Sequence, residues 1–295
     1  MHVVIGGASG FLGAPLVAHL REQGHQVTRL VRSGPQSEDA SLWDPKDGQI
    51  DQVLIDRADA VINLSGSPIS QWPRTSKRKQ EILDSRITAT STLATAIAQS
   101  TTPAVLLSGS GMSWYGVDRS DEVLTETSSP GEGFLAEVSQ QWEDAAAPAV
   151  EAGARTCFLR TSLVLDSAGG VLALMLPAWK LGGGATLGSG RQYMSLITRT
   201  DWIRAVTHLV DSDVSGPVNL AMPDAVINAE FTDALGHAVH RPTFLKAPAF
   251  AVRAALGGLA DDLLGSLRLT PQVLTDTGFS FESPDLPSAL AAAIH

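Results

Sequence analysis

The stretch VVIGGASGFLG, residues 3–13, runs from apolar residues into a cluster of glycines and back into apolar residues. The first apolar run predicts a short buried strand over residues 1–6, and the second predicts a helix over residues 11–23. Glycine inside a structured segment costs about 1 kcal/mol relative to alanine. Several glycines at one point therefore indicate a backbone that another group must approach closely.

A strand, a glycine-rich turn and a helix, in that order, are typical of dinucleotide binding. The spacing here is G-x-x-G-x-x-G, formed by Gly7, Gly10 and Gly13. We expect Gly7 to permit the tight turn, Gly10 to let the backbone reach a pyrophosphate, and Gly13 to let helix and strand pack closely. The alternative is a plain strand-to-helix turn that binds nothing. The sequence predicts cofactor contacts at Gly7, Ser9, Gly10, Phe11, Leu12 and Gly13.

The second predicted strand, residues 25–31, bears on which nucleotide binds. NAD-binding sites usually carry an acidic residue near the end of this strand, where it holds the ribose 2′-hydroxyl. Here the strand is followed by Arg32, whose guanidinium can stack on adenine and pair with a 2′-phosphate. The sequence therefore favours NADP(H) over NAD, with a solvated arginine at a strand end as the alternative.

Strands and helices alternate through the first half of the chain. Further apolar strands are predicted over residues 58–66, 103–110 and 155–160, with helices over 76–99 and 134–152 between them. This alternation predicts an α/β fold, a Rossmann-like doubly wound parallel sheet with helices on both faces.

Beyond about residue 166 the pattern changes to shorter segments broken by glycine and proline. We expect a helix capped by Thr200 or Asp201, and helical segments from Asn228 onward. These features predict a smaller C-terminal lobe on the substrate side of the protein. The predicted division assigns residues 1–165 and 193–220 to an NADP-binding domain, and residues 166–192 and 221–295 to the lobe.

The composition limits the class of protein. The 295 residues are 44% hydrophobic and 18% charged, which supports a sizeable core rather than bulk disorder. A net charge of −10 disfavours a nucleic-acid partner, and no apolar stretch reaches the length of a membrane span. A single cysteine, Cys157, and an N-terminus unlike a secretory leader predict a cytoplasmic protein. The histidines show no metal-ligand spacing, and the basic run over 74–80 is expected to be a solvated helix face.

Longer motifs extend along the chain. They are WDP at 43–45, VINLSG at 61–66, RKQEILDSRI at 78–87, SGSGMSWYG at 108–116, GEGFLAEVSQQWE at 131–143, LRTSLVL at 159–165 and LGSGRQYMSLI at 187–197. With the glycine turn they resemble extended short-chain dehydrogenases/reductases, in particular the atypical subgroup labelled epimerase-family or cell-division-inhibitor-like. The resemblance covers essentially the whole chain. It implies a bound nicotinamide cofactor, a small C-terminal domain, and a small-molecule substrate of the kind largely unassigned in this subgroup.

The resemblance also implies a serine that holds the substrate oxygen, and a tyrosine followed four residues later by a lysine. Ser110 occupies the serine position, whereas Leu135 and Ser139 stand where the tyrosine and the lysine are expected. The usual proton relay is therefore absent. Tyr115 follows the Ser110 loop and is a second catalytic candidate, with packing beside Trp114 as the alternative.

Further cofactor candidates lie outside the glycine turn. Glu81 and Arg86 belong to the long predicted helix, and the resemblance places a basic group there against the nicotinamide ribose or a substrate anion. The alternative for this pair is an exposed helix salt bridge, which is a weak interaction. The remaining candidates lie at the ends of predicted strands, and they are Leu64, Ser65, Gly66, Ser108 and Val164.

Two functions remain open from the sequence. The first is an NADP(H)-dependent oxidoreductase or epimerase with a non-standard acid/base group and its substrate in the cleft between the lobes. The second is a catalytically impaired NADPH-binding sensor that acts through a protein partner. The missing tyrosine and lysine favour the sensor, whereas the Trp and Met residues of the predicted substrate side favour the enzyme. A homodimer is left open.

Overall fold

The computed structural model of the protein describes residues 1–34, 37, 39–69, 73–257 and 259–294. The chain forms two compact units. Unit 1 comprises Met1–Gly111, Glu137–Arg160 and Ile203–Pro217, and unit 2 comprises Met112–Ala136, Thr161–Trp202 and Val218–His295. The predicted NADP-binding domain differs from unit 1 mainly at residues 112–136 and 193–202, which belong to unit 2.

Seven strands form the main sheet, in the order β12-β7-β5-β4-β1-β2-β3. The neighbours β1–β2, β2–β3, β1–β4 and β4–β5 pair in parallel. The strand order runs outward from β1 in one direction and then resumes at β4 on the other side, so the predicted doubly wound fold is confirmed. The strands are β1 His2–Gly6, β2 Gln26–Val31, β3 Ala40–Leu42, β4 Ala60–Asn63, β5 Val105–Gly111, β7 Thr156–Thr161 and β12 Gly216–Leu220.

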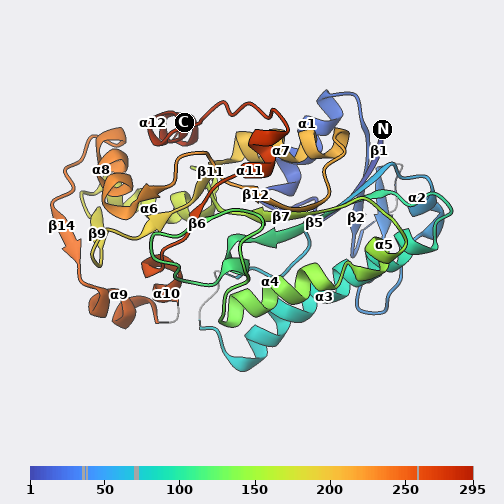
Figure 1. The fold of residues 1–295 in the computed structure, drawn as a ribbon, viewed down its shortest axis with the longest axis horizontal. Helices are drawn as coiled ribbons and strands as arrows, with labels where there is room; N and C mark the ends of the chain where they lie inside the picture. The colour runs from blue at the N-terminus through green and yellow to red at the C-terminus, as the bar shows by residue number, and fades with distance from the viewer. Residues whose placement is uncertain (35–36, 38, 70–72, 258, 295) are drawn as a thin grey trace. The chain divides into compact units, whose positions relative to one another are not determined.

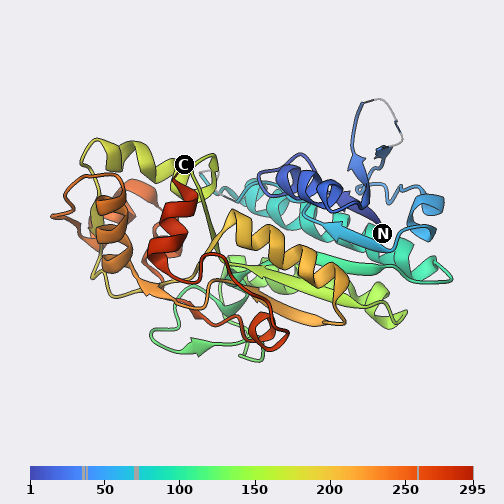
Figure 2. The same cartoon turned by 90° about the horizontal axis from the view of Figure 1, so that it is seen from above.

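Helices cover both faces of this sheet, with α1 and α7 on one face and α3, α4 and α5 on the other (Figures 1 and 2). Because neither face meets water, Val4 in β1 and Val61 in β4 are fully buried, and both strands read as continuous apolar runs. Doubly wound folds bind ligands at the carboxyl ends of the strands where the order reverses, here β1 and β4. The helices are α1 Gly13–Glu22, α2 Gln52–Asp56, α3 Ser76–Gln99, α4 Phe134–Asp144, α5 Ala147–Glu151 and α7 Arg199–Asp211.

Two helix ends differ from the sequence expectation. The single helix predicted over 134–152 is two helices, α4 and α5, with Pro148 in the first turn of α5. Proline has no N–H and its ring clashes with the preceding turn, so the first helix ends before it. Helix α7 is capped by Thr198, whose Oγ1 accepts the N–H of Asp201 at 3.0 Å, and neither Thr200 nor Asp201 is the cap.

Unit 2 is built from short strand pairs and helices around its own apolar core. Leu176, Phe231 and Leu290 belong to this core. The strand pairs β6–β15, β8–β11 and β9–β14 are parallel, and β10–β13 is antiparallel. The strands are β6 Val123–Leu124, β8 Leu163–Asp166, β9 Ala185–Leu187, β10 Tyr193–Met194, β11 Leu196–Thr198, β13 Val226–Ile227, β14 Leu245–Ala247 and β15 Arg268–Leu269.

The helices of unit 2 follow the sequence expectation better than its strands do. They are η1 Met112–Tyr115, α6 Gly170–Lys180, α8 Asn228–Ala238, α9 Ala249–Leu256, α10 Leu259–Leu264, α11 Gln272–Asp276 and α12 Leu286–Ala293. Strands as short as β14 and β15 carry too few residues for a detectable alternation, so the sequence predicts only helices beyond Asn228. Among the helices that the structure describes, none combines the length and the apolarity that crossing a membrane requires.

Candidate functional site

The turn between β1 and α1 requires two of its glycines for the fold itself. Gly7 has a φ of +79°, and a Cβ atom there would lie 2.6 Å from the backbone of Leu64. A Cβ atom at Gly13 would overlap the carbonyl oxygen of Gly7. The tight turn expected at Gly7 and the close helix–strand packing expected at Gly13 are therefore both present.

Gly10 differs from these two glycines because an added Cβ atom there would make one tight contact rather than overlap the backbone. It is exposed, and within 4 Å of an added Cβ atom lies only the carbonyl oxygen of Gly7, at 3.3 Å, among the atoms that the structure describes. The N-cap of α1 is Leu12, which offers no side-chain acceptor, and the first turn carries no acidic residue. The turn thus combines an open backbone with uncapped N–H groups at a helix N-terminus, an arrangement that fits a pyrophosphate.

The end of β4 lies beside the glycine turn. The backbone N–H of Leu64 donates to the carbonyl oxygen of Gly6 at 2.9 Å, and the Asn63 side chain accepts the N–H of Ser65 at 3.0 Å. The Ser65 hydroxyl is buried, and within the described part of the chain it has no hydrogen-bond partner. An orphaned hydroxyl at this edge of the sheet fits a site that a ligand completes.

Arg86 of α3 is a buried cation next to the same loop. Its side chain is 9% exposed, and its Nη1 donates to the carbonyl oxygens of Ser67 and Ile82, both at 3.0 Å. Its guanidinium lies 4.9 Å from the ring centroid of Trp142, and a Cβ atom at Gly66 would lie 3.0 Å from it. No carboxylate among the residues described pairs with it.

Burial, with a smaller contribution from the charge of Arg78, lowers the pKa of Arg86 to about 10. Arg86 therefore stays positively charged at neutral pH. A buried guanidinium without a carboxylate carries a desolvation cost that an anion can offset. This charge is available to a phosphate or carboxylate group of a ligand.

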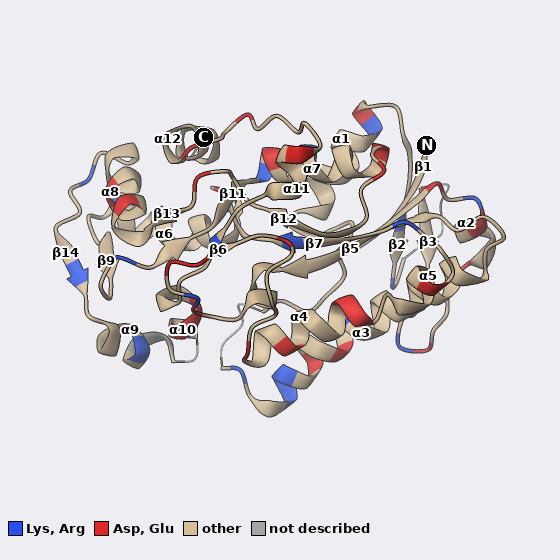
Figure 3. Cartoon of the chain, in the orientation of Figure 1, with Lys and Arg blue, Asp and Glu red and all other residues tan. Residues whose placement is uncertain are grey.

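Glu81 does not pair with Arg86. Its carboxylate contacts Arg78 at 2.8 Å and accepts the hydroxyl of Ser67 at 3.1 Å, and these hydrogen bonds lower the pKa of Glu81. Glu81 is 54% exposed, so the exposed salt bridge expected for Glu81 exists, but with Arg78 as its partner. Figure 3 shows the basic residues at the start of α3, where Lys77 is exposed.

Three arginines of α1, β2 and the residue after β2 differ in their ion pairs. Arg21 and Arg29 both contact Asp39 at 3.0 Å, and hydrogen bonds from Ser37 and Arg21 lower the pKa of Asp39 to about 2. Arg32, immediately after β2, is exposed and makes no hydrogen bond or ion pair with any described residue. Its guanidinium is therefore available to a 2′-phosphate.

Ser110, near the end of β5, belongs to a buried polar cluster. Its hydroxyl donates to Oε1 of Glu143 at 2.7 Å. Arg160 of β7 forms two contacts of 2.9 Å with the same carboxylate, through Nε and Nη2. Ser110, Arg160 and Glu143 are 6%, 3% and 10% exposed. Ser108 is fully buried, with only a 3.5 Å contact to the carbonyl oxygen of Gly109.

Sequence reasoning missed Glu143 and its neighbour Trp142. The Trp142 indole donates to the hydroxyl of Thr90 at 2.9 Å, and a Cβ atom at Gly109 would lie 2.7 Å from the Trp142 ring. The motif GEGFLAEVSQQWE contains both residues, and Glu143 lies one helical turn beyond Ser139. An acidic residue at this spacing was the available signal, but no local pattern connects it to Ser110.

Tyr115 belongs to unit 2 and is fully buried. Its hydroxyl donates to Oδ1 of Asn219 at 2.7 Å, and its ring meets Trp114 edge-on with centroids 5.1 Å apart. This geometry favours the packing role and disfavours proton transfer by this hydroxyl. Val164 also belongs to unit 2 and is 9% exposed.

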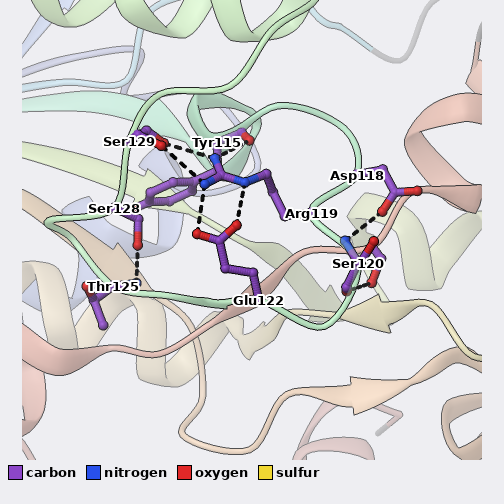
Figure 4. Close-up of polar contacts among 9 residues, drawn as sticks. Tyr115, Asp118, Arg119, Ser120, Glu122, Thr125, Ser128 and Ser129 are labelled. Atoms are coloured by element: carbon purple, nitrogen blue, oxygen red, sulfur yellow. Dashed lines mark hydrogen bonds and ion pairs between the residues drawn. The ribbon is translucent and has the colours of Figure 1, made fainter.

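The loop that follows Tyr115 is held together by Arg119, as Figure 4 shows. Arg119 forms two contacts of 2.8 Å with Glu122, and it donates to the carbonyl oxygens of Ser129 at 3.0 Å and Tyr115 at 3.4 Å. The bidentate pair and the two carbonyl bonds join both ends of this loop. The acidic stretch around Glu122 therefore has a structural role in unit 2.

Comparison with known proteins shows similarity along most of the chain. The model of the NAD dependent epimerase/dehydratase family matches residues 3–222, and a domain of unknown function (DUF1731) matches residues 247–293. The epimerase family protein Mb2239 of Mycobacterium bovis is 44% identical over 99% of this chain and 97% of its own length. The cell-division-inhibitor-like label has no support from these relatives.

Two solved structures are similar to the chain in fold and sequence. The crystal structure of the human epimerase family protein SDR39U1 (isoform 2) with NADPH is 30% identical, covers 99% of both chains and has a TM-score of 0.89. The nucleoside-diphosphate sugar epimerase of Corynebacterium glutamicum is 33% identical with a TM-score of 0.83. The match to that protein covers 100% of this chain and 58% of the Corynebacterium chain.

Proposed function

The chain belongs to the NAD dependent epimerase/dehydratase family, and from that premise we propose that it is an NADP(H)-dependent oxidoreductase or epimerase without a tyrosine–lysine pair. We propose a small molecule as its substrate. The cofactor, when bound, supplies hydride transfer, and the protein supplies binding, orientation and proton movement.

The observation that carries the proposal is the turn between β1 and α1. Gly10 is exposed, an added Cβ atom there would have one described neighbour within 4 Å, and α1 begins without a side-chain cap. Both features suit a pyrophosphate at the helix N-terminus. The similar human protein SDR39U1 was crystallised with NADPH, which supports the same choice of cofactor for this chain.

The other proposed cofactor contacts lie on either side of this turn. The guanidinium of Arg32, which has no partner among the described residues, would pair with the 2′-phosphate. The guanidinium of Arg86 would pair with an anionic group near the nicotinamide half. The Ser65 hydroxyl lacks a partner among described residues and is the third proposed contact. Leu64, Gly66, Glu81, Ser108 and Val164 complete the proposed set.

Ser110 is proposed to contact the oxygen of the substrate. The sensor remains the second candidate, because the positions of the expected tyrosine and lysine carry no acid–base group. Leu135 has no titratable proton, and Ser139 is a buried, uncharged side chain. An enzyme needs another proton-handling group in their place, whereas a sensor needs none. Turnover therefore separates the two functions.

The first experiment measures dissociation constants for NADPH and NADH by nicotinamide fluorescence, in the wild type and in Arg32→Ala. We expect the wild type to bind NADPH more tightly than NADH. In Arg32→Ala the ratio of the NADH to the NADPH dissociation constant should fall about tenfold or more, as loss of a charge-assisted contact predicts. Arg29→Ala is the matched control, because Arg29 already pairs with Asp39. Equal wild-type affinities for the two nucleotides would overturn the NADP(H) assignment.

The second experiment follows NADPH oxidation with a panel of aldehydes and ketones, and NADP⁺ reduction with the corresponding alcohols. Turnover of any member supports the oxidoreductase. Tight NADPH binding without turnover of any member would favour the sensor.

A further inference from the structure

The cluster of Ser110, Glu143 and Arg160 joins three elements of unit 1 that are far apart in the sequence. Oε1 of Glu143 accepts both the hydroxyl of Ser110, at 2.7 Å, and Nε of Arg160, at 2.9 Å. Its Oε2 accepts Nη2 of Arg160 at 2.9 Å. The bidentate arginine fixes the plane of the carboxylate and so fixes the oxygen that faces Ser110.

This geometry decides what Ser110 can offer a substrate. A serine hydroxyl has one proton and two acceptor lone pairs. Because the proton of Ser110 points to Glu143, the lone pairs are what remain for a ligand. Such an oxygen accepts a hydrogen bond from a substrate hydroxyl, and it does not donate one to a carbonyl while Glu143 is ionised.

Glu143 also lies on the side of α4 where the family's proton relay would stand. Leu135, Ser139 and Glu143 are spaced four residues apart, so they share one face of the helix. The chain lacks a titratable group at the first two positions and has a carboxylate at the third. That carboxylate is the group that contacts the serine.

We propose that Glu143, held by Arg160, accepts a proton through Ser110 in place of the missing tyrosine–lysine pair, and that the substrate enters as an alcohol. The proposal rests on the proposed function. The proton of the substrate hydroxyl moves to Ser110 Oγ while the proton of Ser110 moves to Glu143, so the serine is unchanged overall. The carbinol C–H hydrogen leaves with its electron pair, for which an oxidised nicotinamide is the acceptor, and the C–O single bond becomes a carbonyl.

The groups that face the carboxylate come from separate elements. Arg160 from β7 and the Ser110 hydroxyl from β5 contact Glu143, and Arg86 from α3 stacks on the adjacent Trp142.

Glu143→Gln tests the relay because it keeps the shape of the side chain and removes the proton acceptor. With the alcohol and carbonyl panel as probes, we expect kcat to fall about a hundredfold or more, as loss of general acid–base catalysis predicts, with an unchanged NADPH dissociation constant. Ser110→Ala removes the hydroxyl that passes the proton, and kcat should fall there as well.

Carbon-13 NMR of glutamate side-chain carboxyls gives a readout independent of turnover. The Glu143 signal, assigned by its loss in Glu143→Gln, should shift in Ser110→Ala and stay close to its wild-type position in Ser110→Thr. A signal that Ser110→Ala leaves in place would overturn the relay.

A wild-type kcat in Glu143→Gln would also overturn the relay, and would leave the proposed function standing. A wild-type protein that binds NADPH but turns over no probe would overturn the proposed function, and the relay with it.

Discussion

Unit 1 and unit 2 both bury polar side chains, but they satisfy them in different ways. In unit 2 the partners are mostly backbone groups. Asp201, fully buried, accepts the backbone N–H groups of residues 282–283 at 2.8 Å, and Glu126 accepts those of Asn219 and Val273 at 3.1 and 3.2 Å. These carboxylates join segments that are far apart in the chain, which is a structural task.

In unit 1 a group of buried polar residues near the carboxyl ends of β5 and β7 instead pairs side chain with side chain, as Ser110 and Arg160 do with Glu143. Arg160 pairs with Glu143 through Nε and Nη2, whereas Arg86 has no carboxylate partner among the residues that the structure describes. The Ser65 hydroxyl likewise has no partner within the described residues. Buried polar atoms without a described partner occur in both units, and the one at Ser65 differs because it lies beside the glycine turn, where a ligand can complete it.

The largest expected effect separates the two buried arginines of unit 1. Arg160→Ala leaves the Glu143 carboxylate buried without its guanidinium, and we expect it to lower the free energy of unfolding by about 3–5 kcal/mol. Urea denaturation measures this. Arg160→Met combined with Glu143→Leu should lose less than Arg160→Ala alone, because no uncompensated charge remains. A single variant as stable as the wild type would contradict the assigned ion pair.

Arg86→Met should affect NADPH binding more than it affects the free energy of unfolding. Removing a buried cation that has no described carboxylate partner should change the free energy of unfolding by less than Arg160→Ala does. The NADPH dissociation constant should rise about tenfold to a hundredfold, because a charge-assisted contact is worth about 1.5–3 kcal/mol. Fluorescence titration checks the affinity. If Arg86→Met binds NADPH as the wild type does, Arg86 is not a cofactor contact.

The smallest effect belongs to unit 2 and concerns Glu126. Burial raises the pKa of this carboxyl above its ordinary value of 4.5, against opposing backbone hydrogen bonds from Asn219 and others. The folded state therefore binds the proton more tightly than the unfolded state does. As a result, its contribution to stability is lost as the pH rises from 4.5 through the folded pKa.

Glu126→Gln removes this titration and should flatten the stability profile in that window relative to the wild type. Denaturant unfolding at a series of pH values from 4 to 8 measures the difference. NADPH affinity should not change, because Glu126 is assigned a structural role. Identical pH profiles for the two proteins would show that Glu126 titrates normally in the fold.

Some of these features follow from the local sequence. The turn at Gly7 and the packing at Gly13 could be predicted because each depends on a few neighbouring residues and on steric limits that only glycine meets. The bounds of α3 could be predicted for the same reason, since Thr75 caps it and the apolar pattern is regular. Pro148 likewise marks the break between α4 and α5, a signal that helical periodicity alone had hidden.

Other features depend on residues far apart in the chain. Tyr115 is buried because its hydroxyl meets Asn219, 104 residues later, and nothing near Tyr115 indicates this. Glu143 contacts Ser110, 33 residues earlier, and Arg160, 17 residues later, only because three elements converge. The family resemblance identified which groups are missing at Leu135 and Ser139, but it could not identify the group that takes their place.

The most direct test of the nucleotide site is the NADPH dissociation constant of Gly10→Val, measured beside its thermal stability. An added Cβ atom at Gly10 makes a single tight contact, 3.3 Å from the carbonyl oxygen of Gly7, so we expect the variant to fold with a modest loss of thermal stability. Its side chain would occupy the place proposed for the pyrophosphate, so binding should weaken by more than about a hundredfold, or roughly 2.7 kcal/mol, with Gly10→Ala intermediate. A folded Gly10→Val protein that binds NADPH with wild-type affinity would contradict the account.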